Sequence, residues 1–372
     1  MKIVGHVFRL SAFLLNGLVA VGFLICAYSP YISPVHHPRW ACAGLFFPIF
    51  LILNAVFCIF WLLVRKRYAL FPFCVFLLGW DALTTYLPWQ FTKSAEPKGE
   101  VVKVLTYNTL GMRTEKDEDG KDINPILDYV IQSDADIVCL QEFPCDNKTL
   151  KKELKKVYPY AEQMKFSGGN GVGCFSRFPI LSAKRILYES ANNGSGAFRL
   201  KFGQDTLLLV INHLESNKLD AHDKEVYTDM LKKPDEEKVK EGGKYLLHKL
   251  ADAVAIRAPQ ADSVAKYVKE HPYKYTVVCG DFNDSPLSYA HRVIGEGLQD
   301  AFVERGSGVG ISYNRNHLYF RIDHLFASPS FRVLVCEVDN SIEASDHYPL
   351  WCLLEKKSNC LLYTSPSPRD TR

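Results

Sequence analysis

Residues 276–283 read TVVCGDFN and join a predicted buried β-strand to a polar turn. The β-branched half favours a strand, and Gly280 lets another backbone pass close to it. Side chains two residues apart lie on the same side of a strand, so we expect Asp281 and Asn283 to converge on one point. The alternative is a plain strand-to-loop turn, in which Asp and Asn side chains bond to their own backbone.

Other apolar runs end in polar residues in the same way. Asn108, Glu142 and His213 each end a run that is otherwise rich in apolar residues. An oxygen ligand at the exposed end of a buried strand suits a hard divalent cation. Taken singly, the alternatives are surface positions for Asn108 and Glu142, and a loop cap or core residue for His213.

A histidine near the C-terminal end has a candidate carboxylate partner. His347 follows Ser345 and Asp346 ahead of a strand-like run, and Asp323 lies in an earlier run. A carboxylate on one ring nitrogen of His347 would fix its tautomer and leave the other nitrogen free to exchange a proton. The alternative is a buried Asp–His pair with a structural role only.

The strand-like runs are numerous enough to predict extensive sheet. They are short, rich in β-branched and aromatic residues, and cover residues 101–106, 136–140, 171–176, 206–212, 275–280, 321–327, 331–338 and 348–354. Helical patterns occur at residues 125–132, 148–157 and 221–270, the last with an expected break at Pro259. The mixture predicts an α+β fold, a four-layer α/β/β/α sandwich of two packed mixed sheets flanked by helices. Residues 217–274 are interpreted as a solvated helical face, with a lid or specificity element as the alternative.

Residues 1–90 differ in composition from the rest and predict a transmembrane region. Apolar runs over residues 10–28, 40–64 and 68–88 are each long enough to cross a hydrocarbon core of about 30 Å, which takes about 20 helical residues. The third run contains Asp81, and a re-entrant segment is its alternative. The alternative for the whole region is a cleaved signal peptide followed by buried helices.

Basic residues set the expected orientation. Lys2 and Arg9 lie before or at the start of the first run, and residues 65–67 read RKR between the second and third. We expect both clusters on the cytoplasmic side of a bacterial inner membrane, so that three spans place the remaining chain outside the cytoplasm. If the third run does not cross, the following domain is cytoplasmic instead.

The rest of the chain divides into three parts. Residues 91–100 predict a polar linker and residues 101–359 the folded domain, whereas residues 360–372 begin CLLYTSPSPRD, which matches a translated sequencing adapter. We interpret that end as an artefact, with a disordered Ser/Pro-rich tail as the alternative.

The net charge of +3 does not indicate a nucleic-acid-binding surface. The 11 cysteines lack zinc-finger spacing and predict buried free thiols.

Taken together, these motifs resemble those of the endonuclease/exonuclease/phosphatase superfamily. The resemblance covers residues 101–355 and is most specific at residues 280–283 (GDFN) and 345–349 (SDHYP), with support from residues 170–179 (NGVGCFSRFP). Residues 1–100 lie outside it. The family includes deoxyribonuclease I-like nucleases, abasic-site endonucleases, inositol polyphosphate 5-phosphatases and neutral sphingomyelinases.

The resemblance implies a metal site and a set of catalytic roles. Glu142, with help from Asn108, would hold Mg²⁺ or Mn²⁺, and Asp346 would be a second ligand or a nearby acid. Asp281 would orient and deprotonate the attacking water, and Asn283 would bind a phosphoryl oxygen.

The implied site also contains two histidines. His347, oriented by Asp323, would stabilise the transition state, and His213 would hydrogen-bond the phosphate or protonate the leaving group. Further phosphate contacts are expected from three basic residues, Arg315, His317 and Arg321. The alternative for these three is an ordinary basic surface.

We therefore predict a membrane-anchored, Mg²⁺-dependent phosphoesterase, with phosphodiester hydrolysis ahead of monoester hydrolysis. The expected partners are the lipid bilayer and a phosphate ester, either a lipid headgroup or a nucleic acid, with no obligate protein partner. The alternatives are a nuclease acting on DNA or RNA, a phosphomonoesterase acting on inositol or lipid phosphates, and a catalytically inactive binding module at the membrane.

Overall fold

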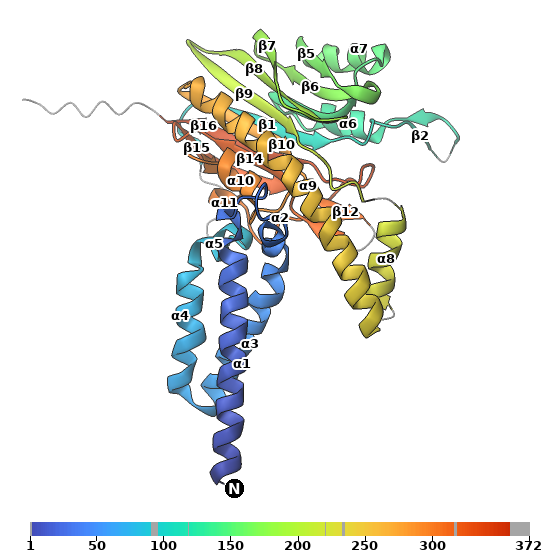
Figure 1. Ribbon diagram of the computed structural model, residues 1–372. Coiled ribbons are helices and arrows are strands. Elements are labelled where there is room, and N and C mark those ends of the chain that lie inside the picture. The colour runs from blue at the N-terminus through green and yellow to red at the C-terminus, as the bar shows by residue number, and fades with distance from the viewer. Residues whose placement is uncertain are drawn as a thin grey trace, which may run out of the picture.

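A bundle of apolar helices carries a domain built on two packed sheets (Figure 1). The computed structural model describes residues 2–90, 96–117, 119–219, 221–232, 235–315 and 318–357. The predicted phosphate contact His317 and the interpreted artefact at residues 360–372 lie outside the described residues.

One six-stranded sheet has the order β15-β16-β1-β4-β6-β5. Its strands are β1 (Val101–Asn108), β4 (Ile137–Pro144), β5 (Tyr160–Lys165), β6 (Asn170–Ser176), β15 (Phe331–Val338) and β16 (Leu350–Lys356). β1 and β4 run parallel with Asn108 opposite Gln141, and the other pairs are antiparallel. The parallel pair therefore brings Asn108 and Glu142 to the same edge of the sheet.

The second six-stranded sheet has the order β11-β14-β10-β9-β8-β7. Its strands are β7 (Ile180–Ile186), β8 (Gly194–Phe202), β9 (Asp205–His213), β10 (Tyr275–Asp281), β11 (Gln299–Asp300) and β14 (Asp323–Ala327). β9 and β10 run parallel, and the other pairs are antiparallel. Both sheets are therefore mixed, as predicted.

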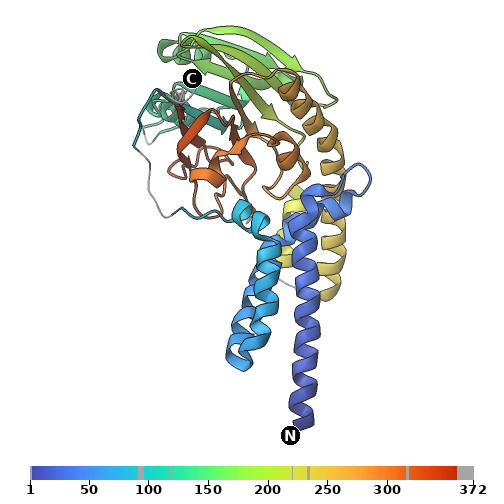
Figure 2. The ribbon, with the colours of Figure 1, turned by 90° about the vertical axis from the view of Figure 1, so that its left-hand side faces the viewer.

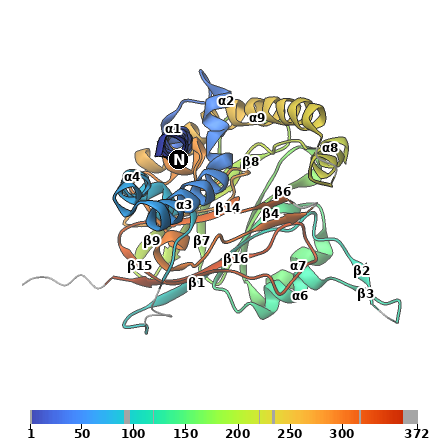
Figure 3. The same cartoon turned by 90° about the horizontal axis from the view of Figure 1, so that it is seen from below.

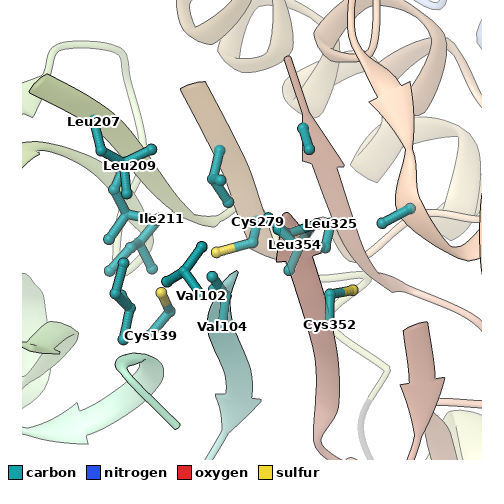
Figure 4. Packing of buried hydrophobic residues seen from close by; sticks show 14 of the residues in the cluster. Val102, Val104, Cys139, Leu207, Leu209, Ile211, Cys279, Leu325, Cys352 and Leu354 are labelled. Atoms are coloured by element: carbon teal, nitrogen blue, oxygen red, sulfur yellow. The ribbon is translucent and has the colours of Figure 1, made fainter. Parts of the chain in front are cut away.

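Apolar side chains from the two inner faces fill the space between the sheets (Figure 4). Val102, Val104 and Cys139 of the first sheet and Ile211 and Cys279 of the second are inaccessible to solvent. The cysteines of both sheets are free and buried, which confirms the prediction for the domain core.

Helices cover the outer faces of both sheets. The first sheet packs against α6 (Pro125–Gln132) and α7 (Lys148–Val157), and the second against α9 (Glu236–Glu270) and α10 (Tyr289–Ile294). The predicted α/β/β/α order is thus confirmed. The predicted break at Pro259 is wrong, because α9 continues through it; packing of Ala261 and Val264 on the second sheet outweighs the lost backbone hydrogen bond.

The remaining elements of the domain are short. They are β2 (Glu115–Lys116), β3 (Asp122–Ile123), η4 (Ser167–Gly169), α8 (Ala221–Lys232), α11 (Ala301–Arg305), β12 (Tyr313–Arg315) and β13 (Leu318–Phe320). β2 pairs with β3 and β12 with β13, so each makes a two-stranded hairpin.

The N-terminal region contains two stretches long and apolar enough to cross a membrane, Gly5–Tyr31 and Pro38–Val64, each of 27 residues. They contain α1 (Lys2–Tyr28), η1 (Ser29–Tyr31), α2 (Pro38–Ala41), η2 (Cys42–Phe46) and α3 (Phe47–Val64). Asn16 is buried between them and accepts a hydrogen bond from the Trp61 indole nitrogen at 3.0 Å.

The third apolar run is two helices rather than one straight span. After η3 (Lys66–Ala69), α4 (Leu70–Leu78) and α5 (Trp80–Tyr86) meet at Gly79, and the paired segments are bent by 67°. Asp81 lies in the first turn of α5, where a carboxylate favours a helix start.

α1, α3 and α4 pack together below the domain (Figures 1 and 2), and the view from below shows their ends side by side (Figure 3). The turn between α3 and α4, which carries residues 65–67, lies at the end of the bundle away from the domain (Figure 1). α4 carries the chain back towards the domain and α5 lies beside it (Figure 1); beyond α5, Gln90 donates a hydrogen bond to the Val303 carbonyl at 3.1 Å.

Candidate active site

Strand register brings three of the predicted residues into one row. In the second sheet, Asp281 at the end of β10 lies opposite His213 of β9 and opposite Asp323 of β14. All three are buried. Because these strands are hydrogen-bonded neighbours, the row follows from the sheet itself and not from a flexible loop.

The first sheet contributes to the same point through Asn108. Its amide nitrogen donates to Glu142 Oε1 at 3.2 Å and to Asp281 Oδ2 at 3.0 Å. The Ser345 hydroxyl donates to the Asn108 carbonyl at 2.8 Å, which holds the strand end. Asn108 therefore links the two sheets at the site.

Asp281 is the centre of the cluster. Its Oδ2 accepts a hydrogen bond from Asn283 Nδ2 at 3.2 Å and lies 3.7 Å from Nε2 of both His213 and His347. Its Oδ1 accepts from the Asn283 N–H at 2.8 Å. Burial raises the pKa of Asp281; His347 lowers this pKa and the Asp323 carboxylate raises it. The carboxylate is thus aligned by fixed donors and has an increased affinity for a proton.

Gly280 is required by space and by backbone conformation. Its φ is 127°, and a Cβ there would lie 2.1 Å from the Asn212 carbonyl oxygen. The predicted close approach of another backbone is therefore real, and the neighbouring strand is β9. Asn283 has a φ of 53°, a left-handed conformation that Asn adopts more readily than most residues.

Glu142 is aimed at the site by an irregularity in the first sheet. The pairing of β4 with β6 shifts between Leu140 and Phe143, and Glu142 has a φ of 50°. A bulge of this kind redirects a side chain at the cost of local strain. The Glu142 side chain keeps 30% of its surface exposed and lies at the solvent-facing side of the cluster.

His347 and Asp323 form the predicted pair. His347 Nδ1 lies 2.7 Å from Asp323 Oδ2, and the Asp323 N–H donates to the Ser312 hydroxyl at 3.0 Å. Burial alone would lower the pKa of His347, but Asp323 and Asp281 raise it to about 10. His347 is therefore an imidazolium at neutral pH.

His213 has the opposite preference. Burial lowers its pKa below the ordinary value of 6.5, Asp281 opposes the shift, and the charged His347 adds to it. Its Nε2 lies 3.8 Å from Glu142 Oε1, so the neutral ring faces both carboxylates of the cluster.

The donor set fits a hard divalent cation. Asp281 and Asp323 offer carboxylate oxygens within 4.8 Å of each other and of a His347 ring nitrogen, but the protonated His347 ring has no free lone pair and is not itself a ligand. Asp323 is already hydrogen-bonded to His347. Glu142, whose side chain is partly exposed and accepts a hydrogen bond from the Asn108 amide, is therefore the carboxylate that an incoming cation can reach. Oxygen donors of this kind suit Mg²⁺ or Mn²⁺, and a bound cation offsets the cost of burying carboxylates.

Other predicted residues lie outside the cluster. Asp346 and Arg315 line a neighbouring cavity of about 290 Å³, and Arg315 donates to the carbonyls of Glu343 and Ser345 at 3.3 and 3.2 Å. The structure does not bring Arg321 to the site. Its guanidinium is buried, donates to the Thr85 carbonyl and lies 4.5 Å from the Phe302 ring centre.

Arg257 supports the site but is absent from the sequence prediction. It is buried in α9, its Nε lies 3.2 Å from Asp284 Oδ2, and Nη1 donates to the Glu215 carbonyl at 2.7 Å. It thus joins the segment after His213 to the segment after Asn283. A lone arginine among alanines in residues 251–261 is the only local signal, and it does not identify these partners.

Residues 105–347 match the model of the endonuclease/exonuclease/phosphatase family, which is more than half of the chain. The chain belongs to this family. The match confirms the predicted resemblance and makes the protein a hydrolase that acts on phosphate esters. Residues 6–86 match a second family model, a domain of unknown function (DUF8431).

The chain is also similar to several solved structures. Humanized D. rerio TDP2 with 14 mutations has 17% identity and a TM-score of 0.48, covering 69% of this chain and 99% of that one. The human Nocturnin catalytic domain has 15% identity and a TM-score of 0.49, covering 71% and 100%. A family protein from Beutenbergia cavernae has 16% identity and a TM-score of 0.46, covering 69% and 72%. A search of curated proteins found no significant match.

Proposed function

We propose that this protein is a membrane-anchored phosphodiesterase that uses a divalent cation, Mg²⁺ or Mn²⁺. The observation that carries the proposal is the convergence of Asn108, Asn283, His213 and His347 on the buried Asp281 carboxylate. Positioned donors and fixed charges are what phosphoryl transfer requires of a protein. The complete set argues against an inactive binding module.

The chain's own residues support an in-line hydrolysis. Asp281 accepts a proton from water as the water oxygen bonds to phosphorus, and the bond from phosphorus to the leaving oxygen breaks. The leaving oxygen takes a proton from solvent. The positive charge of His347 stabilises the negative charge that builds up on the phosphoryl oxygens, and the neutral His213 ring offers a hydrogen bond. Glu142 would hold the cation, which when bound neutralises phosphate charge, and the Asn108 amide nitrogen would orient the Glu142 carboxylate, because the Asn108 amide oxygen is taken by the Leu110 N–H.

We assign the domain to the outside of the cytoplasmic membrane. The basic residues 65–67 lie at the end of the bundle away from the domain, and such residues favour the cytoplasmic side. A reporter phosphatase fused after Gln90 should then be active in cells. A reporter that is silent there, but active when fused after Arg67, would reverse the orientation.

A bilayer beside the site makes phospholipid and sphingolipid headgroups the proposed substrates, with nucleic acid as the second candidate. The hydrolytic activity of the full chain in lipid nanodiscs, measured with lipid, DNA, RNA and inositol phosphate substrates, would decide between them. Release of a phosphorylated headgroup supports the lipid assignment, and cleavage confined to DNA or RNA contradicts it.

The activity itself can be tested with bis(p-nitrophenyl) phosphate. The full chain in detergent micelles should hydrolyse it with Mg²⁺ or Mn²⁺ and lose activity in EDTA. Asp281→Ala and His347→Ala should abolish most of the rate, whereas Asp122→Ala, whose side chain is 67% exposed, should not. Equal rates in wild type and both site variants would remove the enzyme assignment.

A further inference from the structure

The segment that follows the catalytic residues is packed into the membrane region. Leu287 lies four residues after Asn283 and keeps only 3% of its surface exposed. It belongs to a cluster whose other buried members all come from the N-terminal helices: Ala20, Phe23, Cys26, Ala27, Phe47, Val75, Ala82 and Leu83. The active-site loop is therefore in direct contact with the top of the bundle.

Gly44 and Ser29 form the closest part of this contact. A Cβ on Gly44 would lie 2.2 Å from the Leu287 carbonyl oxygen and 2.8 Å from Ser29 Oγ. The Ser29 hydroxyl donates its proton to the Cys26 carbonyl at 2.8 Å, and its oxygen lies 3.4 Å from the Leu287 carbonyl oxygen. Backbone thus approaches backbone here, and only a glycine leaves room for it.

The helix after the loop is fixed to the same surface. In α10, Arg292 Nε donates to the Pro30 carbonyl at 2.8 Å, and its guanidinium lies 5.0 Å from the Tyr31 ring centre. Pro30 and Tyr31 belong to η1, directly above α1. The segment from Leu287 to Arg292 therefore has no independent position relative to the bundle.

The opposite side of the loop is held by α9. Arg257 bonds to Asp284 and to Asn217 Oδ1 at 3.0 Å, and Asn217 Nδ2 donates to the Asn283 carbonyl at 3.3 Å. Near Arg257, α9 packs through Val254 on Cys42 of η2. The loop between Asn283 and α10 is thus enclosed by α9 and the membrane region.

We propose that the membrane region is a structural part of the active site: Gly44 and Ser29 are positioning residues that fix Leu287, and through it set Asn283 and Asp281. They touch no reacting atom and act through the loop. The kinetic side of this inference rests on the phosphodiesterase function proposed above. The family match at residues 105–347 does not include the bundle, so this contact belongs to the two regions together.

The test compares alanine substitutions at two glycines of the bundle, each made in the full chain and measured in nanodiscs. Gly44→Ala should lower kcat at least about tenfold and leave KM within about twofold, since a misplacement of about 1 Å at a catalytic group can cost about a hundredfold. Gly17→Ala is the matched control, because its Cβ would meet nothing within 4 Å. Amide hydrogen exchange should rise in residues 282–292 of Gly44→Ala and stay unchanged in β1.

A second variant covers failure of Gly44→Ala to fold. Leu287→Ala removes a side chain instead of adding one and should give the same changes, whereas Leu187→Ala, at an 82% exposed position, should not. Wild-type kcat and wild-type exchange in both Gly44→Ala and Leu287→Ala would overturn the proposal. If the wild type hydrolyses no phosphate ester, the proposed function fails, and the exchange rates still decide the positioning role.

Discussion

His213 and His347 lie on two sides of one carboxylate and prefer opposite charges. Each has its Nε2 3.7 Å from Asp281 Oδ2, and each is buried. Burial dominates at His213 and lowers its pKa, whereas Asp323, 2.7 Å from Nδ1 of His347, helps to raise the pKa of His347 to about 10. The partner of the far ring nitrogen therefore decides the charge, and the distance to the shared carboxylate does not.

This difference in pKa gives the site one cationic and one neutral imidazole around a single base. A cation beside the base stabilises charge that develops on a phosphate, and a neutral ring can donate a hydrogen bond without repelling a metal ion. Substitutions at Asp281, Asp323 and His347 each remove one part of this asymmetry.

Removal of the shared carboxylate should have the largest effect. In Asp281→Asn, both histidines lose their shared carboxylate and the base is removed, so kcat for a phosphodiester should fall about a thousandfold. Initial rates with saturating substrate would show it. Asp122→Asn, at an exposed position, is the control and should keep the wild-type rate; a loss below about tenfold in Asp281→Asn would reject Asp281 as the base.

Asp323→Asn should make His347 resemble His213. Without the carboxylate on Nδ1, the pKa of His347 should fall, the ring should be neutral at pH 7.5, and kcat should drop about a hundredfold. Asp300→Asn is a matched control, because it breaks a second buried Asp–His pair, His291–Asp300 at 2.9 Å, outside the site. Equal losses in both variants would mean that His347 has only a structural role.

The proton held by His347 should make the free energy of unfolding depend on pH. The pKa of His347 is about 10 in the folded protein and about 6.5 when unfolded, so the folded state holds a proton that the unfolded state releases between these values. This stabilisation is complete below pH 6.5 and is lost as pH rises to about 10, by about 1.4 kcal/mol per pH unit.

The measurement is denaturant unfolding in detergent micelles, in metal-free buffer, from pH 6 to 10.5. The difference in unfolding free energy between wild type and His347→Gln should narrow as the pH rises. A difference that stays constant over this range would show that His347 is not charged in the folded protein.

The strand ends could be predicted because their signal is local. An apolar run followed by Asn108, Glu142, His213 or Asp281 predicts a buried strand and a polar end, and parallel pairing brings such ends to one edge. The prediction missed β5, β7 and β8. β5 and β7 are edge strands, and exposed residues such as Lys184 interrupt the apolar pattern of β7; the β8 sequence begins with two glycines, Gly194 and Gly196, which do not favour a strand.

The direction of a side chain outside a strand, and contacts between segments far apart in the sequence, could not be predicted in the same way. Arg321 lies two residues before Asp323, but β14 begins only at Asp323, so strand alternation does not apply and the guanidinium points to Thr85. The contact between Gly44 and Leu287 joins segments more than 200 residues apart, and the sequence around neither residue indicates it.

The most direct test of the account is the titration of the two histidines by NMR in the full chain with labelled histidine, assigned with His213→Gln and His347→Gln. We predict that at pH 8 the His347 ring is still protonated and the His213 ring is neutral. If both rings titrate together near pH 6.5, the asymmetry around Asp281 is absent and the proposed division of roles is contradicted.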